Sequence, residues 1–213
     1  MPVRPLPRRF FARDPRRGAR ELLGKLLIRR KGKKRLAGRI VEVEAYLGEG
    51  DPAAHAAAGL TARNRVLFGP PGHAYVYFIY GNHFCLNVSC QPEGEAGCVL
   101  IRALEPLTGL HEMARACRLP TAAQRHLESS VVASRKLTTG PGRLCQALAI
   151  TRARDNGKDL TSPRSGLWIA ADGFRPRRVA RTPRIGIKKA AGEKLRYIIA
   201  GSEFVSGKRI AKR

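Results

Sequence analysis

The residues best suited to chemistry lie in the stretch Arg39–His55, which reads R-I-V-E-V-E-A-Y-L-G-E-G-D-P-A-A-H. Its first part alternates with period two, which predicts a β-strand that carries Glu42, Glu44 and Tyr46 on one face. A carboxylate can take a proton from water and so act as a general base. Glu44 is our candidate for that role, and His55 follows beyond an acidic loop.

The composition makes acids on this strand unusual. The 213 residues include 41 Lys and Arg but only 16 Asp and Glu, which gives a formal net charge of +25. Self-repulsion of that size indicates a polyanionic partner, with DNA or RNA ranked first and an anionic membrane surface second. Solvated charge without a partner is the alternative. Because carboxylates weaken binding to a polyanion, we expect that Glu44 does chemistry on a nucleic acid.

Length and hydropathy bound the class of protein. With 43% hydrophobic residues, residues 1–213 are predicted to form a single domain, with 1–9 and 208–213 disordered. The chain shows no apolar signal segment of about 7–15 residues and no run of roughly 18 apolar residues that would cross a bilayer. We therefore expect no secretion and no membrane partner. The expected location is cytoplasmic and nucleoid-associated in a bacterium, or nuclear in a eukaryote. The five cysteines are expected to be reduced and buried.

The strand that carries Glu44 needs a scaffold, and local patterns predict one. Asp14-Pro15 is typical of a helix start, and Gly24 of a helix end. The predicted order of strands and helices does not alternate as βαβ, so the fold class is predicted to be α+β, with a mainly antiparallel curved sheet and several peripheral helices. Strands are expected at 25–30, 36–47, 74–81, 84–89, 98–104, 167–170, 184–187 and 195–200, and helices at 106–118, 126–135 and 143–150.

Four aromatic rings stand near this strand or on the β-prone run that follows. Tyr46, His55, Tyr77 and Tyr80 could stack on unpaired bases, and such stacking contributes roughly 1–3 kcal/mol per base. The alternative is that Tyr75 and Tyr77 are ordinary core aromatics of a strand. Tyr80 differs, because it stands at the predicted end of its strand and could present its ring as a wedge into a base stack.

Two basic residues, Arg102 and Arg143, are further candidates for the site. Arg102 lies on a mostly apolar strand face, where a charge needs a partner or a substrate. It could orient the water that Glu44 activates, although a partly buried Glu–Arg ion pair explains the same pattern. Gly140-Pro141-Gly142 precedes a predicted helix, and its N–H groups together with Arg143 form a candidate phosphate seat.

Metal chemistry has little support in the sequence. His55 has no second His or Cys at ligand spacing, and the cysteines fit no common zinc pattern. A two-metal nuclease built on Glu42, Glu44 and Asp51 stays an alternative, but acids are scarce elsewhere in the chain. We expect neither a metal nor a cofactor.

Taken together, these motifs resemble the alkyladenine (3-methyladenine) DNA glycosylases, the type shared by mammals and many bacteria. The resemblance runs from about Phe10 to Gly207 and rests on five ordered motifs with kept spacing. They are Gly38–Gly48 with Ala53-Ala54-His55, Tyr75–Gly81, Cys85–Ser89, Val99–Pro106 and Gly140–Leu148.

The resemblance implies a monofunctional enzyme that turns a damaged purine out of double-stranded DNA and hydrolyses its bond to deoxyribose. A monomer is the simplest expectation for its oligomeric state. The implied substrates are 3-methyladenine, 7-methylguanine, hypoxanthine and ethenoadenine, whose removal starts base excision repair. Asn87 would reject guanine by crowding its exocyclic amine. The implied roles are Glu44 as general base and Arg102 as holder of the water, Tyr46, His55, Tyr77 and Asn87 as base pocket, and Tyr80, Arg63, Arg65, Gly140, Gly142 and Arg143 as DNA contacts.

The chain departs from the family pattern in two places. Asn82 stands where an apolar residue is expected beside the wedge, and residues 193–197 lack the Trp or Phe often found there. A function of another class also fits the tyrosines, namely a non-enzymatic nucleic-acid-binding module that only stacks bases. Glu44 speaks against that module, because a pure binder has no use for a carboxylate in its pocket.

Overall fold

The computed structural model describes residues 2–79 and 81–207, and its sheet is organised around one long strand. Strand β3 (Lys34–Tyr46) pairs antiparallel with β6 (Cys98–Thr108) along one edge. Its other edge is shared by two strands: β2 (Leu26–Lys31) pairs with its first half, and β9 (Arg196–Ile199) pairs with Glu42–Glu44. The strand that carries the candidate base therefore has neighbours on both sides.

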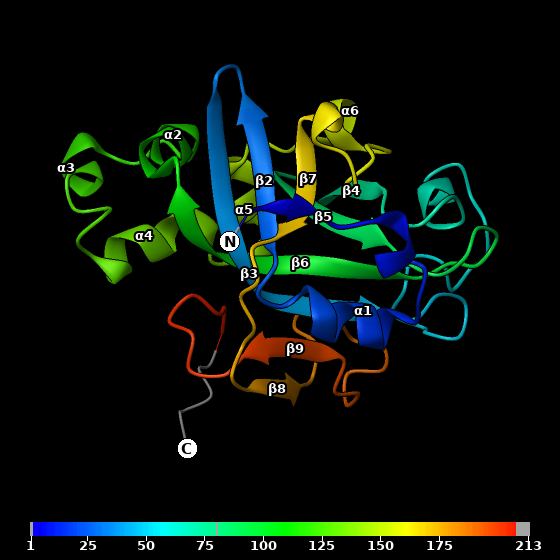
Figure 1. The fold of residues 1–213 in the computed structure, drawn as a ribbon. Coiled ribbons are helices and arrows are strands. Elements are labelled where there is room, and N and C mark those ends of the chain that lie inside the picture. The colour runs from blue at the N-terminus through cyan, green and yellow to red at the C-terminus, as the bar shows by residue number, and fades with distance from the viewer. Residues whose placement is uncertain (1, 80, 208–213) are drawn as a thin grey trace.

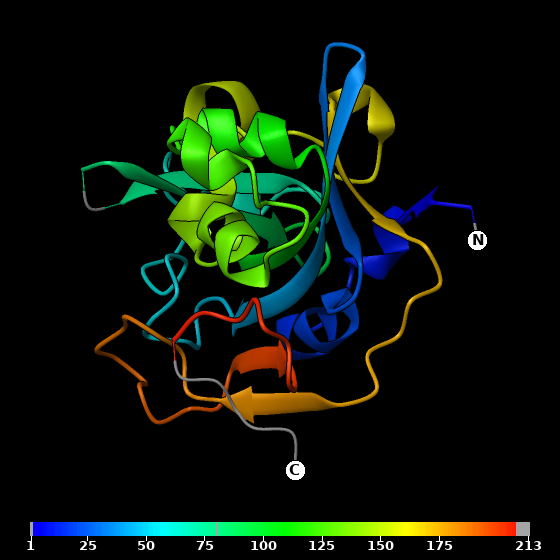
Figure 2. The same cartoon turned by 90° about the vertical axis from the view of Figure 1, so that its left-hand side faces the viewer.

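The other strands extend this centre into one nine-stranded sheet, all of whose pairs are antiparallel (Figure 1). Bulges between β3 and β6 near Gly38 and Glu42 bend the sheet, which curls in Figure 2. The predicted α+β class with a curved antiparallel sheet is confirmed. The sheet order is β1-β7-β2-β3-β6-β5-β4 with β8 on β9, and the remaining bounds are Arg4–Pro5 for β1, Ala74–Ile79 for β4, His83–Ser89 for β5, Leu167–Ala171 for β7 and Val179–Thr182 for β8.

Helices cover the two faces of the sheet unequally. Helices α4 and α5 pack on β5 and β6 from one side, whereas α1 packs against β3 from the other (Figures 1 and 2). No helix in the described ranges is long and apolar enough to cross a membrane. The helices are α1 (Pro15–Leu22), α2 (Leu110–Ala116), α3 (Thr121–Gln124), α4 (Val131–Thr138), α5 (Pro141–Ala147) and α6 (Arg152–Asp155), with 3₁₀ turns at Arg8–Phe10, Arg65–Leu67 and Pro163–Ser165.

Helix α1 forms for the reasons that its sequence indicates. The Asp14 carboxylate accepts a hydrogen bond of 2.7 Å from the backbone N–H of Arg16, which caps the helix start. Ala19 and Leu22 are fully buried against the sheet. Gly24 then takes a φ of +85°, a conformation that side chains rarely adopt, so the chain turns into β2.

Two predicted helices are wrong in their extent. The helix expected over 106–118 begins only at Leu110, because β6 continues through Thr108 and its pairing with β3 outweighs local helix propensity. The helix expected over 126–135 is also displaced. Helix α4 starts at Val131, where the Ser130 side chain accepts from the N–H of Ala133 and so caps the helix.

Two further expectations fail at the ends of the chain. The strand expected at 184–187 is a bent segment, and the local strand lies instead at Val179–Thr182, paired with β9. Residues 4–9 are not disordered, because β1 pairs with β7 and Leu6 is buried. Residues 208–213, for which disorder is also expected, lie outside the described residues. All five cysteines are free thiols, and all but the partly exposed Cys117 are buried.

Candidate active site

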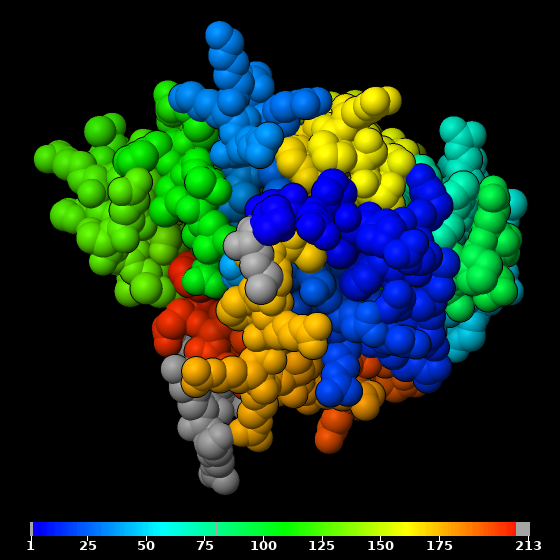
Figure 3. All heavy atoms as spheres, in the orientation of Figure 1, coloured from blue at the N-terminus to red at the C-terminus, as the bar shows by residue number. Residues whose placement is uncertain are grey.

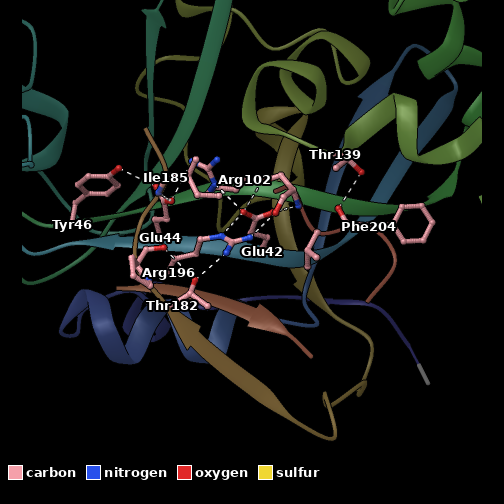
Figure 4. A network of polar contacts seen from close by, with 12 residues as sticks. Glu42, Glu44, Tyr46, Arg102, Thr139, Thr182, Ile185, Arg196 and Phe204 are labelled. Atoms are coloured by element: carbon pink, nitrogen blue, oxygen red, sulfur yellow. Dashed lines mark hydrogen bonds and ion pairs between the residues drawn. The ribbon is translucent and has the colours of Figure 1, made fainter. Parts of the chain in front are cut away.

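Glu44 lies at the centre of a small polar cluster and has no exposed surface. The Tyr46 hydroxyl donates to its Oε2 at 3.0 Å, and the backbone N–H of Ile185 donates to its Oε1 at 2.8 Å. Arg102 Nη1 lies 3.2 Å from the same Oε1 (Figure 4). Strand β3 supplies Glu44 and Tyr46, β6 supplies Arg102, and the bent segment after β8 supplies Ile185. The structure thus brings together Glu44, Tyr46 and Arg102 as the sequence predicts.

The protonation of this cluster is set by burial and by close charges. Burial raises the pKa of Glu44 above its usual range, and the Arg102 guanidinium and the Ile185 N–H offset only part of that effect. Burial pushes the pKa of Arg102 down, but the carboxylates of Glu44 and Glu42 outweigh it and leave that pKa raised. Arg102 therefore stays charged, and Glu44 accepts a proton more readily than an exposed carboxylate does.

Glu42, two residues earlier on β3, has a different surrounding. Its Oε1 accepts from Arg102 Nε at 2.9 Å and from Arg196 Nε at 2.7 Å. Ser206 adds two hydrogen bonds, one from its backbone N–H at 2.6 Å and one from its hydroxyl at 2.8 Å. Four donors satisfy this fully buried carboxylate, so Glu42 is an ion-pair support that holds Arg102 in place.

A cavity of about 510 Å³ lies beside Glu44. The side chains of Tyr46 and Arg102 and the segment at Ile185 line it, so all three partners of Glu44 face the cavity. Glu44 itself sits directly behind this wall. Besides these three, the lining consists of Ala53, His55, Tyr75, Tyr77, Ile79, His83, Cys85, Asn87, Cys98, Leu100, Thr139, Gly140, Pro141, Gly142, Arg143, Gly186 and Ile187.

Three rings form one aromatic wall of the cavity. His55 contacts Tyr77, with ring centroids 4.4 Å apart and planes at 61°. Its Nδ1 lies 2.8 Å from the hydroxyl of Tyr75. Burial, and the nearby charge of Arg63, lower the pKa of His55, so its ring is neutral at pH 7. The rings of His55 and Tyr77 are in direct contact, so a base can enter between them only if one ring shifts.

The sequence leaves open whether Tyr75 is a core residue or part of the site, and in the structure it is both. Only 2% of it is exposed, yet its hydroxyl orients His55 and its ring lines the cavity. The signal was available, because Tyr75 and Tyr77 are two apart on one strand and so share a face.

Asn87 is held rigidly at the cavity wall. Its Nδ2 donates to the carbonyl of Tyr75 at 3.2 Å, and the Cys98 thiol donates to its Oδ1 at 3.7 Å. Only 2% of Asn87 is exposed. A side chain fixed in this way cannot swing aside for a larger ligand.

The predicted DNA contacts are only partly gathered at this cavity. Gly140, Gly142 and Arg143 line it at the start of α5, whereas Arg65 does not. Gly142 also packs closely, because a Cβ atom there would meet the His83 ring at 2.8 Å. Arg63 is exposed and lies 5.9 Å from the Tyr77 ring centroid. Tyr80, the predicted wedge, lies outside the described residues.

A second buried ion pair supports the cavity, and sequence reasoning missed it. Arg184 Nη2 donates to Asp51 at 2.9 Å, and Arg184 Nη1 donates to the carbonyl of Ala45 at 3.1 Å. The Arg184 guanidinium also lies 4.7 Å from the Tyr46 ring centroid. Asp51 in turn accepts from the N–H groups of Leu47 and Ala53. The pair therefore ties the loop of His55 and the segment of Ile185 to strand β3.

The same contacts bear on the two-metal nuclease. Its three proposed ligands are each engaged by arginine: Glu42 and Glu44 by Arg102, and Asp51 by Arg184. Within residues 2–79 and 81–207, no group of three or more His, Cys, Asp and Glu side chains is arranged to hold a metal ion.

Comparisons with known proteins agree with this geometry. The model of the methylpurine-DNA glycosylase family matches residues 9–203. A protein of Koribacter versatilis is 64% identical over 205 residues, which is 96% of this chain and 94% of that protein. A Burkholderia cenocepacia protein is 47% identical over 203 residues (95% and 91%), and one of Methanocella arvoryzae is 46% identical over 196 residues (92% and 90%). All three carry the provisional name 3-methyladenine DNA glycosylase. The resemblance drawn from the motifs is confirmed, and the chain belongs to the methylpurine-DNA glycosylase family, hydrolases that act on N-glycosyl bonds.

Proposed function

We propose that this DNA glycosylase releases 3-methyladenine, 7-methylguanine, hypoxanthine and ethenoadenine from double-stranded DNA, with Glu44 as general base and water as nucleophile. The observation that carries the proposal is the position of Glu44. It is a buried carboxylate of raised pKa, and all three of its polar partners line one aromatic cavity. The product is an abasic site, so the reaction starts base excision repair.

The reaction begins when the damaged nucleotide leaves the base stack and enters the cavity. Once the His55 or Tyr77 ring has shifted, the rings of Tyr46, His55 and Tyr77 hold the base by stacking, which contributes roughly 1–3 kcal/mol per base. The oxygen of a water molecule then bonds to C1′ of the deoxyribose, and its proton passes to Glu44. The bond between C1′ and the purine nitrogen breaks, and its electron pair leaves with the base. Arg102 donates to the water and holds it in line.

The substrate range follows from how easily each base leaves. An alkylated purine that carries a positive charge takes up the electron pair readily, so one carboxylate and a stacking cavity suffice. A neutral base such as hypoxanthine must also gain a proton as it leaves. We propose that Asn87 excludes guanine, because its amide is held by two hydrogen bonds and crowds the exocyclic amine.

The enzyme is proposed to grip DNA as a monomer around the mouth of the cavity. Arg63, Arg65 and Arg143 are exposed cations that suit phosphate contacts. The N–H groups at Gly140 and Gly142 suit another phosphate. Tyr80 is assigned the wedge by the family resemblance alone.

One experiment separates the glycosylase from its rivals. A duplex oligonucleotide with one hypoxanthine or ethenoadenine is incubated with the protein in EDTA and then treated with hot alkali. Strand cleavage only after alkali is the expected result, because a monofunctional glycosylase leaves an intact abasic strand. Cleavage that needs a divalent metal instead supports the nuclease, and no cleavage on any lesion duplex supports the binding module.

A further inference from the structure

A second hollow, of about 740 Å³, lies between helix α1 and residues 174–179. We call it the α1 hollow and define it by its five cations. Figure 3 shows these two segments side by side on one face, α1 in blue and 174–179 in yellow-orange. The cations are Arg17, Arg20, Lys25, Arg175 and Arg177, and the only acid in the lining is Glu21.

The positive charge of the α1 hollow is not neutralised by the protein. Glu21 is engaged by Arg13 and Arg17. Arg20, Arg175 and Arg177 are exposed, and none of them takes part in an ion pair with a carboxylate within residues 2–79 and 81–207. Three guanidinium groups that converge on one hollow without a counter-ion favour an anionic occupant.

The α1 hollow is remote from the catalytic cavity. In Figure 2, α1 and residues 174–179 lie on one side of the sheet, whereas α5, whose start lines the cavity, covers the opposite side. Because the cavity and these cations lie on opposite sides of the sheet, we expect a duplex bound at the cavity not to reach them. Charge in the α1 hollow therefore adds little to the grip on the damaged segment, and it calls for a second ligand.

We propose that the α1 hollow is a second DNA-binding site, which holds the phosphates of another duplex segment while the first is still bound at the cavity. Duplex DNA is the occupant that the chemistry favours. It is already the partner of this family, and guanidinium groups bind phosphates in two-point hydrogen bonds. Release of condensed counterions supplies the affinity. The consequence is direct transfer of the enzyme from one DNA segment to another.

The test uses two triple variants of the full chain that lose equal charge. The first is Arg20→Gln/Arg175→Gln/Arg177→Gln in the α1 hollow. The control is Arg30→Gln/Lys33→Gln/Arg35→Gln at the β2–β3 turn, where the side chains are also exposed. Each variant lowers the formal net charge from +25 to +22, since 25 minus 3 is 22. Circular dichroism and single-turnover base release on a short lesion duplex check that both variants fold and act normally.

Transfer is measured by following the departure of the enzyme from a labelled undamaged duplex as unlabelled duplex is added. For the natural chain and the control, the departure rate should rise in proportion to competitor, because transfer passes through a complex with both duplexes. For the hollow variant, the slope of departure rate against competitor concentration should fall about fivefold or more. The slope of the logarithm of the second binding constant against the logarithm of salt concentration should also become shallower by about 0.9 per lost phosphate contact. Equal slopes in all three proteins, or a flat response of the natural chain, would overturn the proposal.

A bridging assay separates DNA from other anionic partners. Beads that carry one undamaged duplex should capture a second, labelled duplex only when the natural chain or the control is present. A hollow variant that still bridges contradicts the proposal, since bridging would then come from paired protein molecules. Anionic phosphatidylglycerol vesicles are run in parallel. If the hollow variant loses vesicle binding while DNA transfer is unchanged, the surface serves a membrane and the DNA proposal is wrong.

Discussion

Glu42 and Glu44 stand two residues apart on one strand, are equally buried and contact the same arginine, yet their surroundings differ. Glu42 receives four hydrogen bonds, from Arg102, Arg196 and twice from Ser206. Glu44 receives one from Tyr46 and one from the N–H of Ile185, with Arg102 3.2 Å away. The first carboxylate is satisfied by the protein, whereas the second is surrounded by groups that face a cavity.

This difference shows how a buried acid is given a function. The Glu42 carboxylate is engaged by two guanidinium groups and by both donors of Ser206, so it holds Arg102 and Arg196 in place. Burial raises the pKa of Glu44, so this carboxylate accepts a proton more readily, which suits the proposed general base. From the donors around them, we assign Glu42 as a support and propose Glu44 as the base.

The largest effect on stability should come from the support. Glu42→Gln leaves Arg102 and Arg196 buried without their shared counter-ion, which should lower the free energy of unfolding by about 3–5 kcal/mol. Urea unfolding measures it. The matched control is Glu49→Gln, an exposed residue of the following loop, which should stay within about 0.5 kcal/mol of the natural chain. A similar loss of unfolding free energy in both variants would show that Glu42 supports the fold no more than the exposed Glu49 does.

A third buried acid sharpens the comparison, because it supports the fold and the cavity together. Asp51→Asn weakens the hydrogen bonds to Arg184 and should cost about 1.5–3 kcal/mol of unfolding free energy. Arg184 stacks on Tyr46, so base release should also need a higher enzyme concentration for half-saturation. Unfolding and single-turnover kinetics are measured on the same preparation. A stability loss with unaltered kinetics would separate this ion pair from the catalytic cavity.

The aromatic wall should affect binding without affecting the fold. Tyr77→Ala removes a stacking partner and should weaken the affinity for a lesion duplex by about 1–3 kcal/mol. Affinity for the matching undamaged duplex is the internal control and should be unchanged, because an unflipped base never meets Tyr77. Equal loss on both duplexes would assign Tyr77 to DNA grip instead of base recognition.

The smallest effect concerns pH and stability. The folded pKa of Glu44 is raised above its ordinary value of 4.5, so its contribution to stability is present below that pH and is lost as the pH rises through the raised pKa. Glu44→Gln lacks this loss. Its unfolding free energy relative to the natural chain should therefore grow between pH 4.5 and pH 7, measured by urea unfolding at each pH. If the Glu44→Gln variant instead lost unfolding free energy relative to the natural chain over this range, the raised pKa would be contradicted.

Local patterns in the sequence predicted the parts of this molecule that depend on neighbours along the chain. The alternation of β3, the cap of α1 at Asp14 and the hairpin of β4 and β5 follow from period, capping and β propensity. The wrong helix boundary at 106–109 arose because β6 gains a long partner in β3, which no local pattern reveals.

The candidate site divides in the same way. Glu44, Tyr46 and His55 come from one stretch, the strand patterns add Arg102 and Tyr77, and the family resemblance adds Asn87. The arginine partners of the supporting acids were missed because they are remote in sequence. Asp51 and Arg184 are 133 positions apart, and Glu42 and Arg196 are 154 apart. Such pairs depend on the folded chain, where for example β9 meets β3, and not on any spacing along the sequence.

The central claim is that Glu44, and not Glu42, takes the proton from the attacking water. Its most direct test is base release by Glu44→Gln under single-turnover conditions on a duplex with one ethenoadenine, whose fluorescence also reports base flipping. The expected rate is about 100- to 10,000-fold lower than that of the natural chain, because the general base is gone. Lesion binding and the flipped-base signal should be retained. Base release at the natural rate in this variant would contradict the claim.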